Sequence, residues 1–101
     1  MIEELKEQYE VSRVKWRGIA MDVRHCRNWL NQDGTDHIEV ETDGREELPI
    51  TQTGYKSHFI ASVCIAEAGT ATNYVLLWLD HAAQSPEWRK REAAARQLSL
   101  F

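Results

Sequence analysis

The chain has 101 residues, of which 43% are hydrophobic and 28% are charged, as expected for one globular domain. This composition excludes an intrinsically disordered chain, and no apolar run approaches the length of a membrane span. The formal net charge of −4 excludes a uniformly basic surface, so we do not expect direct nucleic-acid binding.

Charge distribution and cysteine usage indicate the kind of partner and the compartment. Residues 1–84 hold fourteen acids and eight bases, whereas residues 85–101 hold two acids and four bases. This asymmetry fits an acidic partner for the tail, a basic partner for the body, or a solvated mixed surface. Cys26 and Cys64 form no CxxC pair, and no secretory signal opens the chain. We therefore expect a cytoplasmic protein with free thiols and no membrane association.

The N-terminal quarter predicts a short helix followed by one strand. Ile2, Leu5 and Tyr9 have the spacing of one stripe of an amphipathic helix. Apolar residues then alternate with polar ones over residues 14–23, with a change of phase at Gly18. A single strand with a β-bulge at that glycine accounts for the change.

Two further strands are predicted around a strong turn signal. Residues 37–42 alternate as a half-exposed strand, and Asp43-Gly44 is typical of a hairpin turn. Residues 47–51 can form the return strand, which should lie at a sheet edge because Pro49 lacks an amide hydrogen.

The C-terminal half changes to helical periodicity. Residues 63–65 fit either a short strand or a buried loop. A helix is predicted over 72–84, with a stripe of Tyr74, Leu77, Trp78 and His81, and Val75, Leu79 and Ala82 beside it. Ser85-Pro86 is typical of a helix start, and a second helix should run from Glu87 to about Arg96.

These elements predict an α+β fold: a small antiparallel three-stranded sheet covered by one or two helices. Residues 1–96 should form a single domain, with residues 97–101 as a C-terminal docking peptide. The residues expected in the core are Trp16, Ile38, Val40, Ile50, Leu77 and Trp78.

Chemistry-bearing residues form no recognisable catalytic motif. The histidines are His25, His37, His58 and His81, and no two of them have helical metal-ligand spacing. Ser57 and His58 are neighbours, which point to opposite faces of an extended segment. The segment 69–72 lacks the further glycines of a dinucleotide loop and the lysine of a P-loop. We expect a binding protein, not an enzyme, with no metal and no cofactor.

The chain ends in Gln97-Leu98-Ser99-Leu100-Phe101. This pentapeptide resembles, at all five positions, the peptide by which bacterial replication and repair proteins dock on the DNA sliding clamp. The resemblance implies polar contacts by Gln97 and an apolar cleft filled by the leucines and Phe101. It implies a clamp-binding accessory or a competitor for that cleft. The alternative is that the apolar tail packs on its own domain or self-associates.

A second resemblance involves residues 48–59, Leu-Pro-Ile-Thr-Gln-Thr-Gly-Tyr-Lys-Ser-His-Phe. This segment is similar to one in small proteins of bacterial plasmids and other mobile elements, and implies that context without an activity. Tyr55, His58 and Phe59 are candidates for a partner-binding aromatic patch or for a loop that plugs the core.

An acidic hairpin suggests an alternative function. Its members are Glu39, Glu41, Asp43, Glu46 and Glu47. The mobile-element context implies an inhibitor of a host defence nuclease complex, of anti-CRISPR or anti-restriction type, with these carboxylates mimicking phosphates toward a basic groove. The other interpretation is an edge kept soluble by charge.

Overall fold

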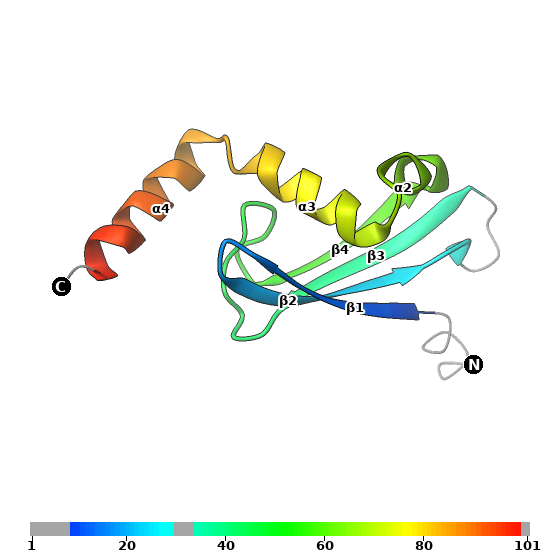
Figure 1. Cartoon of the computed structure of the whole chain (residues 1–101), viewed down its shortest axis with the longest axis horizontal. Helices are drawn as coiled ribbons and strands as arrows, with labels where there is room; N and C mark the ends of the chain where they lie inside the picture. Colours follow the sequence, from blue (N-terminus) through cyan, green and yellow to red (C-terminus); the bar gives the residue numbers. More distant parts are fainter. Residues whose placement is uncertain (1–8, 30–33, 100–101) are drawn as a thin grey trace.

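A computed structural model describes residues 9–29 and 34–99, and they form a four-stranded antiparallel sheet followed by helices (Figure 1). The strands are β1 (Tyr9–Trp16), β2 (Ile19–Cys26), β3 (Thr35–Thr42) and β4 (Tyr55–Ala61), in that spatial order. The described helices are α2 (Ser62–Ala68), α3 (Ala71–Ala82) and α4 (Pro86–Ser99). The fold is α+β, but the expected three-stranded sheet is wrong, because the sheet has four strands.

The first error lies at Gly18. The single strand predicted over residues 14–23 is a hairpin, in which β1 and β2 pair from Trp16↔Ile19 outward. Arg17 and Gly18 have φ angles of 49° and 84°, the left-handed pair that a two-residue hairpin turn needs. The change of phase is therefore a chain reversal and not a bulge. The helix expected around Ile2 and Leu5 lies outside the described residues, and Tyr9 begins β1.

The remaining strand errors follow from the loop after β3. Residues 47–51 are not a return strand: Leu48 and Thr51 form an isolated bridge, and Leu48 is buried. The loop is pinned where the Thr42 hydroxyl donates to the Glu46 carbonyl at 2.9 Å. The true fourth strand is residues 55–61, which pair with β3 along their whole length. This strand was not predicted because its polar and aromatic residues do not alternate in a clear apolar–polar pattern.

The helix predictions are closer to the structure. The helix expected over 72–84 is α3, whose N-cap Thr70 accepts a hydrogen bond from the amide of Asn73 at 3.0 Å. The helix start at Ser85-Pro86 is confirmed, because the Ser85 hydroxyl accepts from the Trp88 amide at 3.2 Å. Residues 63–65 are neither strand nor loop but part of the short helix α2.

The core lies between one face of the sheet and helices α2 and α3. Its fully buried members include Met21, Val23, Ile38, Val40, Val75 and Leu79. Within the broad face predicted for α3, Val75 and Leu79 have no exposed surface, but the expected burial of Leu77 is wrong, because this side chain is 61% exposed. The side of α3 that faces the sheet is the stripe that begins at Ala71. Trp16 is buried as expected, and Ile50 and Trp78 are only partly buried.

Helix α4 leaves this body and projects beyond the sheet (Figure 1). Trp88 in its first turn packs on Trp16, with ring centroids 5.8 Å apart, and is the one buried residue among its described side chains. Two ion pairs add contacts further along, Arg17–Glu92 and Arg91–Glu47. Beyond Glu92 the described side chains of α4 are exposed, so we refer to α4 as the arm and to the remaining described residues as the body.

Candidate functional site

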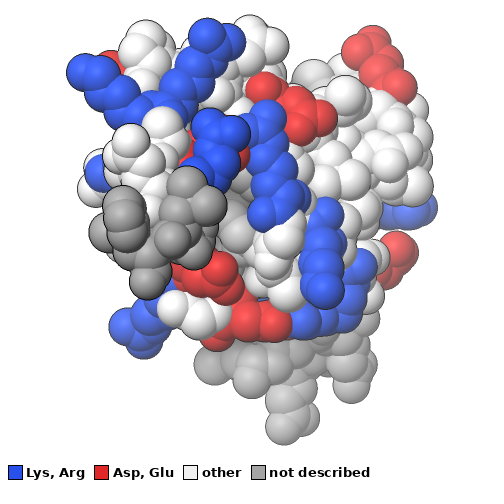
Figure 2. Space-filling view, turned by 60° about the vertical axis from the view of Figure 1, so that its left-hand side comes forward, with Lys and Arg blue, Asp and Glu red and all other residues white. Residues whose placement is uncertain are grey.

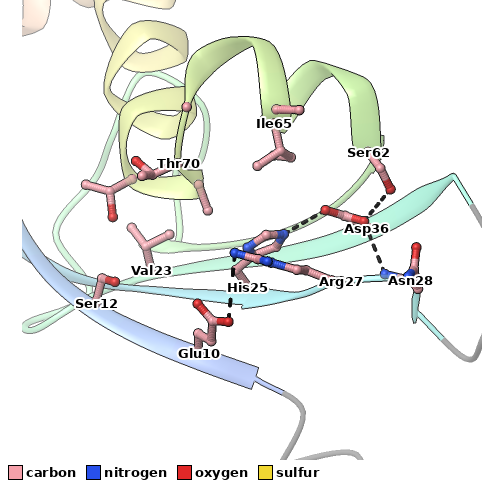
Figure 3. Close-up of a pocket in the computed structure, with 14 residues that line it drawn as sticks. Glu10, Ser12, Val23, His25, Arg27, Asn28, Asp36, Ser62, Ile65 and Thr70 are labelled. Atoms are coloured by element: carbon pink, nitrogen blue, oxygen red, sulfur yellow. Dashed lines mark hydrogen bonds and ion pairs between the residues drawn. The ribbon is translucent and has the colours of Figure 1, made fainter.

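A pocket of about 580 Å³ lies at the end of the sheet where β2 stops and α3 starts (Figure 3). Strands β1, β2 and β3 supply one wall, and α2 with the first turn of α3 supplies the other. A volume of this size is within the usual range for a site that holds a small organic molecule. The residues that carry its chemistry are Glu10, Ser12, His25, Arg27, Asp36 and Thr72.

The pocket floor is a buried histidine–carboxylate pair. His25 is 6% exposed and Asp36 is 3% exposed, and the Nε2 of His25 lies 2.7 Å from Oδ2 of Asp36. The other carboxylate oxygen accepts from the Ser62 hydroxyl at 2.5 Å and from the Asn28 amide at 3.2 Å. Burial alone raises the pKa of Asp36, but hydrogen bonds from Ser62, His25 and the Asn28 amide outweigh it and lower the pKa below its usual value. Asp36 is therefore an ionised acceptor, and His25 donates to it through Nε2.

The mouth and the opposite wall of the pocket carry hydrogen-bond donors. The Arg27 guanidinium is exposed, and its ion pair with Glu10 is a long one of 4.0 Å. Ala71 and Thr72 are the first residues of α3 and line the pocket. Their amides belong to the first turn, where the helix itself provides no acceptor, and the helix dipole favours an anion there.

Sequence reasoning missed this pocket because its residues meet only through strand pairing. His25 and Asp36 are eleven positions apart, on strands that pair antiparallel with His25 opposite Ile38. Ligands on one helix leave a short regular spacing in the sequence, whereas a pair of residues on neighbouring strands leaves no such local signal. Once β2 and β3 are known, their pairing register is enough to bring the two side chains together.

The expected aromatic patch is divided between two faces of β4. Tyr55 and Phe59 lie on the face of the sheet that no described helix covers, and they are 42% and 51% exposed. His58 points to the helix side, where its ring lies 4.4 Å from that of Trp78 and stacks on Tyr74. Strand alternation makes one patch of all three residues impossible.

An aromatic cluster on the uncovered face is centred on His37. Its ring stacks on Phe59 at 4.5 Å and lies 5.8 Å from Trp29. The Tyr9 hydroxyl bonds to Nδ1 of His37, and the Ser57 hydroxyl lies 2.6 Å from Nε2. Burial lowers the pKa of His37, although Glu39 opposes the shift, so this histidine favours its neutral form.

Arginines neutralise much of the predicted acidic surface. Glu39 and Glu41 both face Arg24, at 3.9 Å and 3.2 Å. Asp43 receives two hydrogen bonds of 2.7 Å from Arg13, and Glu47 pairs with Arg91. Four of the five carboxylates proposed to mimic phosphates therefore have a cationic partner, and Glu46 is exposed. This pairing offsets the negative potential that phosphate mimicry requires.

The candidate docking tail continues the arm. Gln97 is exposed on α4, and the backbone of Leu98 and Ser99 is also helical. Leu100 and Phe101 lie outside the described residues. Figure 2 looks toward this end of the molecule and shows lysines and arginines gathered there beside acidic side chains. The cations that α4 contributes are Arg89, Lys90, Arg91 and Arg96.

Neither a group of metal ligands nor a membrane-spanning helix occurs in the part of the chain that the structure describes. In residues 9–29 and 34–99, no three histidine, cysteine, aspartate or glutamate side chains are grouped as a metal site. None of the helices described there combines the length and apolar content needed to cross a membrane. Cys26 is buried and Cys64 partly buried, both as thiols, and burial raises the pKa of Cys26.

Comparison with known proteins gives one match. The sequence model of the family described as the KlcB third domain matches residues 9–88, which is most of the chain and includes the whole sheet, the pocket and Trp88. The match ends before the rest of the arm. No curated protein and no solved structure matches the chain.

Proposed function

We propose that this chain, which belongs to the KlcB third-domain family, is a binding module that docks on the bacterial DNA sliding clamp through Gln97–Phe101. Membership of this family supports the expected relation to proteins of bacterial plasmids. The finer assignment, clamp docking, depends on the tail and on how the body presents it.

The observation that carries the proposal is the projection of the arm. Trp88 anchors the first turn of α4, and the described side chains beyond Glu92 are exposed. The chain therefore leads away from the body before the pentapeptide begins (Figure 1). A partner can reach the tail there without displacing any part of the core.

The composition of the tail supports the same function. Leu98, Leu100 and Phe101 are three large apolar residues in the last four positions. Short peptides with two or three apolar anchors dock into clefts, and such anchors on a chain end need a partner to cover them. Helical backbone at Leu98 and Ser99 implies that docking in an extended form unwinds the last turn of α4. This cost keeps the affinity modest, about micromolar.

The test is calorimetric titration of the intact chain into purified bacterial sliding clamp. Replacing Leu100 and Phe101 together with alanine should abolish binding, because both anchors are lost. The melting temperature should stay nearly unchanged. Leu77→Ala is the matched control, because it removes an apolar side chain that is 61% exposed on the body, and it should bind as the wild type does.

Two results would reject clamp docking. One is no heat of binding with the intact chain. The other is a double variant that unfolds the domain, which would mean that the tail packs on its own body. The alternative of a defence-nuclease inhibitor acts through the acidic hairpin, and the ion pairs to Arg13, Arg24 and Arg91 do not favour it.

A further inference from the structure

We propose that the pocket between β2 and the start of α3 binds a small organic phosphate ester. The phosphate group lies between the first turn of α3 and Arg27, and a hydroxyl or amino group of the organic part bonds to His25. This site is independent of the tail and of the proposed clamp docking.

The floor of the pocket supplies a ring nitrogen of His25 for a polar group of the ligand. His25 is more than nine-tenths buried, lines the pocket and has its Nε2 held by Asp36 at 2.7 Å. Among the described residues, none is recorded in a hydrogen bond with its Nδ1. This second ring nitrogen is therefore left for the hydroxyl or amino group of a ligand in the pocket, and a hydroxyl can either donate to a ring nitrogen or accept from it.

The first turn of α3 and Arg27 supply the positive charge that an anion needs. The Thr70 hydroxyl accepts a hydrogen bond from the Asn73 amide. The amides of Ala71 and Thr72, at the start of the helix, have no acceptor within the helix. Arg27 also lines the pocket, with a weak ion pair of 4.0 Å to Glu10, and both side chains are about 70% exposed. A phosphate accepts two hydrogen bonds from a guanidinium, so it displaces Glu10 readily.

The pocket geometry selects the ligand class. A volume of about 580 Å³ is larger than an inorganic anion needs, and it suits a small organic molecule. Ser12 and Thr72 add hydroxyls between the two ends, which fits a polyhydroxylated organic part. Val23 and Ile65 provide the apolar surface. The ring nitrogen of His25 on the floor, together with the helix amides and Arg27, suits a molecule that has both a hydroxyl and an anionic group.

The test is a titration of the intact, isotope-labelled chain by nuclear magnetic resonance. The probe is ribose 5-phosphate at about 10 mM, which saturates a site of millimolar affinity. Ribose and inorganic phosphate are titrated separately. Ribose 5-phosphate should shift the amides of Ala71 and Thr72 and the ring nitrogens of His25. Inorganic phosphate should shift only the two amides, and ribose should shift neither.

A matched pair of arginine variants separates binding from folding. Arg27→Gln should weaken binding of ribose 5-phosphate about tenfold, because a charge-assisted hydrogen bond is lost. Arg89→Gln removes an exposed charge on the arm and should leave binding unchanged. Both variants should melt as the wild type does. The proposal is overturned if ribose 5-phosphate shifts none of these signals, if ribose alone shifts them equally, or if Arg27→Gln binds normally.

Discussion

The body and the arm of this molecule are held in place by different forces. In the body, five residues have essentially no exposed surface, and they come from two strands and one helix that are distant in the sequence: Met21, Ile38, Val40, Val75 and Leu79. The arm buries one described side chain, Trp88, and otherwise contacts the body through exposed or half-exposed ion pairs. Burial is the stronger contribution, since a surface ion pair adds at most about 1 kcal/mol.

This difference explains which region can carry which role. The arm has its own helix signals: a serine cap, proline in the first turn and three consecutive alanines. Its helix therefore depends little on the body, and its end can adapt to a partner. The body places His25 and Asp36 within 2.7 Å of each other only because the sheet register is enforced by packing. A rigid body suits a pocket, and a projecting helix suits a docking tail.

The largest expected effect tests the packing of the body. Leu79→Ala should reduce the free energy of unfolding by about 2–5 kcal/mol, the usual range for a buried leucine. Leu77→Ala on the same helix should cost less than about 1 kcal/mol, because that side chain is 61% exposed. Urea denaturation measures both, and the identical change in helix propensity makes the pair a matched control. Equal losses would mean that α3 presents a different face to the sheet.

Acidification should cause a smaller loss of folding stability, and this loss should arise in the body alone. Burial lowers the pKa of His37 and of His58 from the ordinary value of 6.5. Below about pH 6.5 the unfolded chain therefore binds more protons than the folded chain. The free energy of unfolding is at its full value above this pH, and it decreases as the pH falls towards and through the lower pKa values of the folded state. Urea melts at pH 7.5 and at about pH 5.5 should show the loss.

The matched variant for this pH effect is His58→Gln, which removes one of the two titrating rings and should flatten the pH dependence. The arm holds no histidine. Acidification should therefore reduce the protection of α4 amides from hydrogen exchange only to the extent that the whole domain unfolds. A stability that is constant between the two pH values would contradict the lowered pKa values of His37 and His58.

The smallest effect concerns the ion pairs of the arm. Glu92→Gln keeps the shape of the side chain but removes its charge toward Arg17, 2.7 Å away. The side chains are 45% and 29% exposed, so the free energy of unfolding should fall by less than about 1 kcal/mol. Adding salt to the wild type should give a change of the same sign. A loss above about 2 kcal/mol would show that the arm is as tightly bound as the body.

The sequence predictions were more accurate for features set by neighbouring residues, as in the arm, than for features set by packing, as in the body. Elements with local signals were predicted well. The helix expected over residues 72–84 is α3, the helix start at Ser85-Pro86 is confirmed, and residues 37–42 form most of β3. The hairpin at Gly18 was mistaken for a bulge, because a two-residue turn and a bulge produce the same change of phase in a single sequence. Strand β4 was missed because its exposed aromatics, Tyr55 and Phe59, mask the expected alternation.

The sequence by itself determined the local features of this protein: the α+β class, the helix starts, the basic arm and the apolar tail that follows it. Each depends on residues close together in the chain, through capping, helix propensity and charge. Only the tertiary structure decided the number of strands, the buried face of α3 and the pairing of His25 with Asp36. These depend on which strand lies beside which, and that choice is made by burying the largest apolar surface over the whole chain at once.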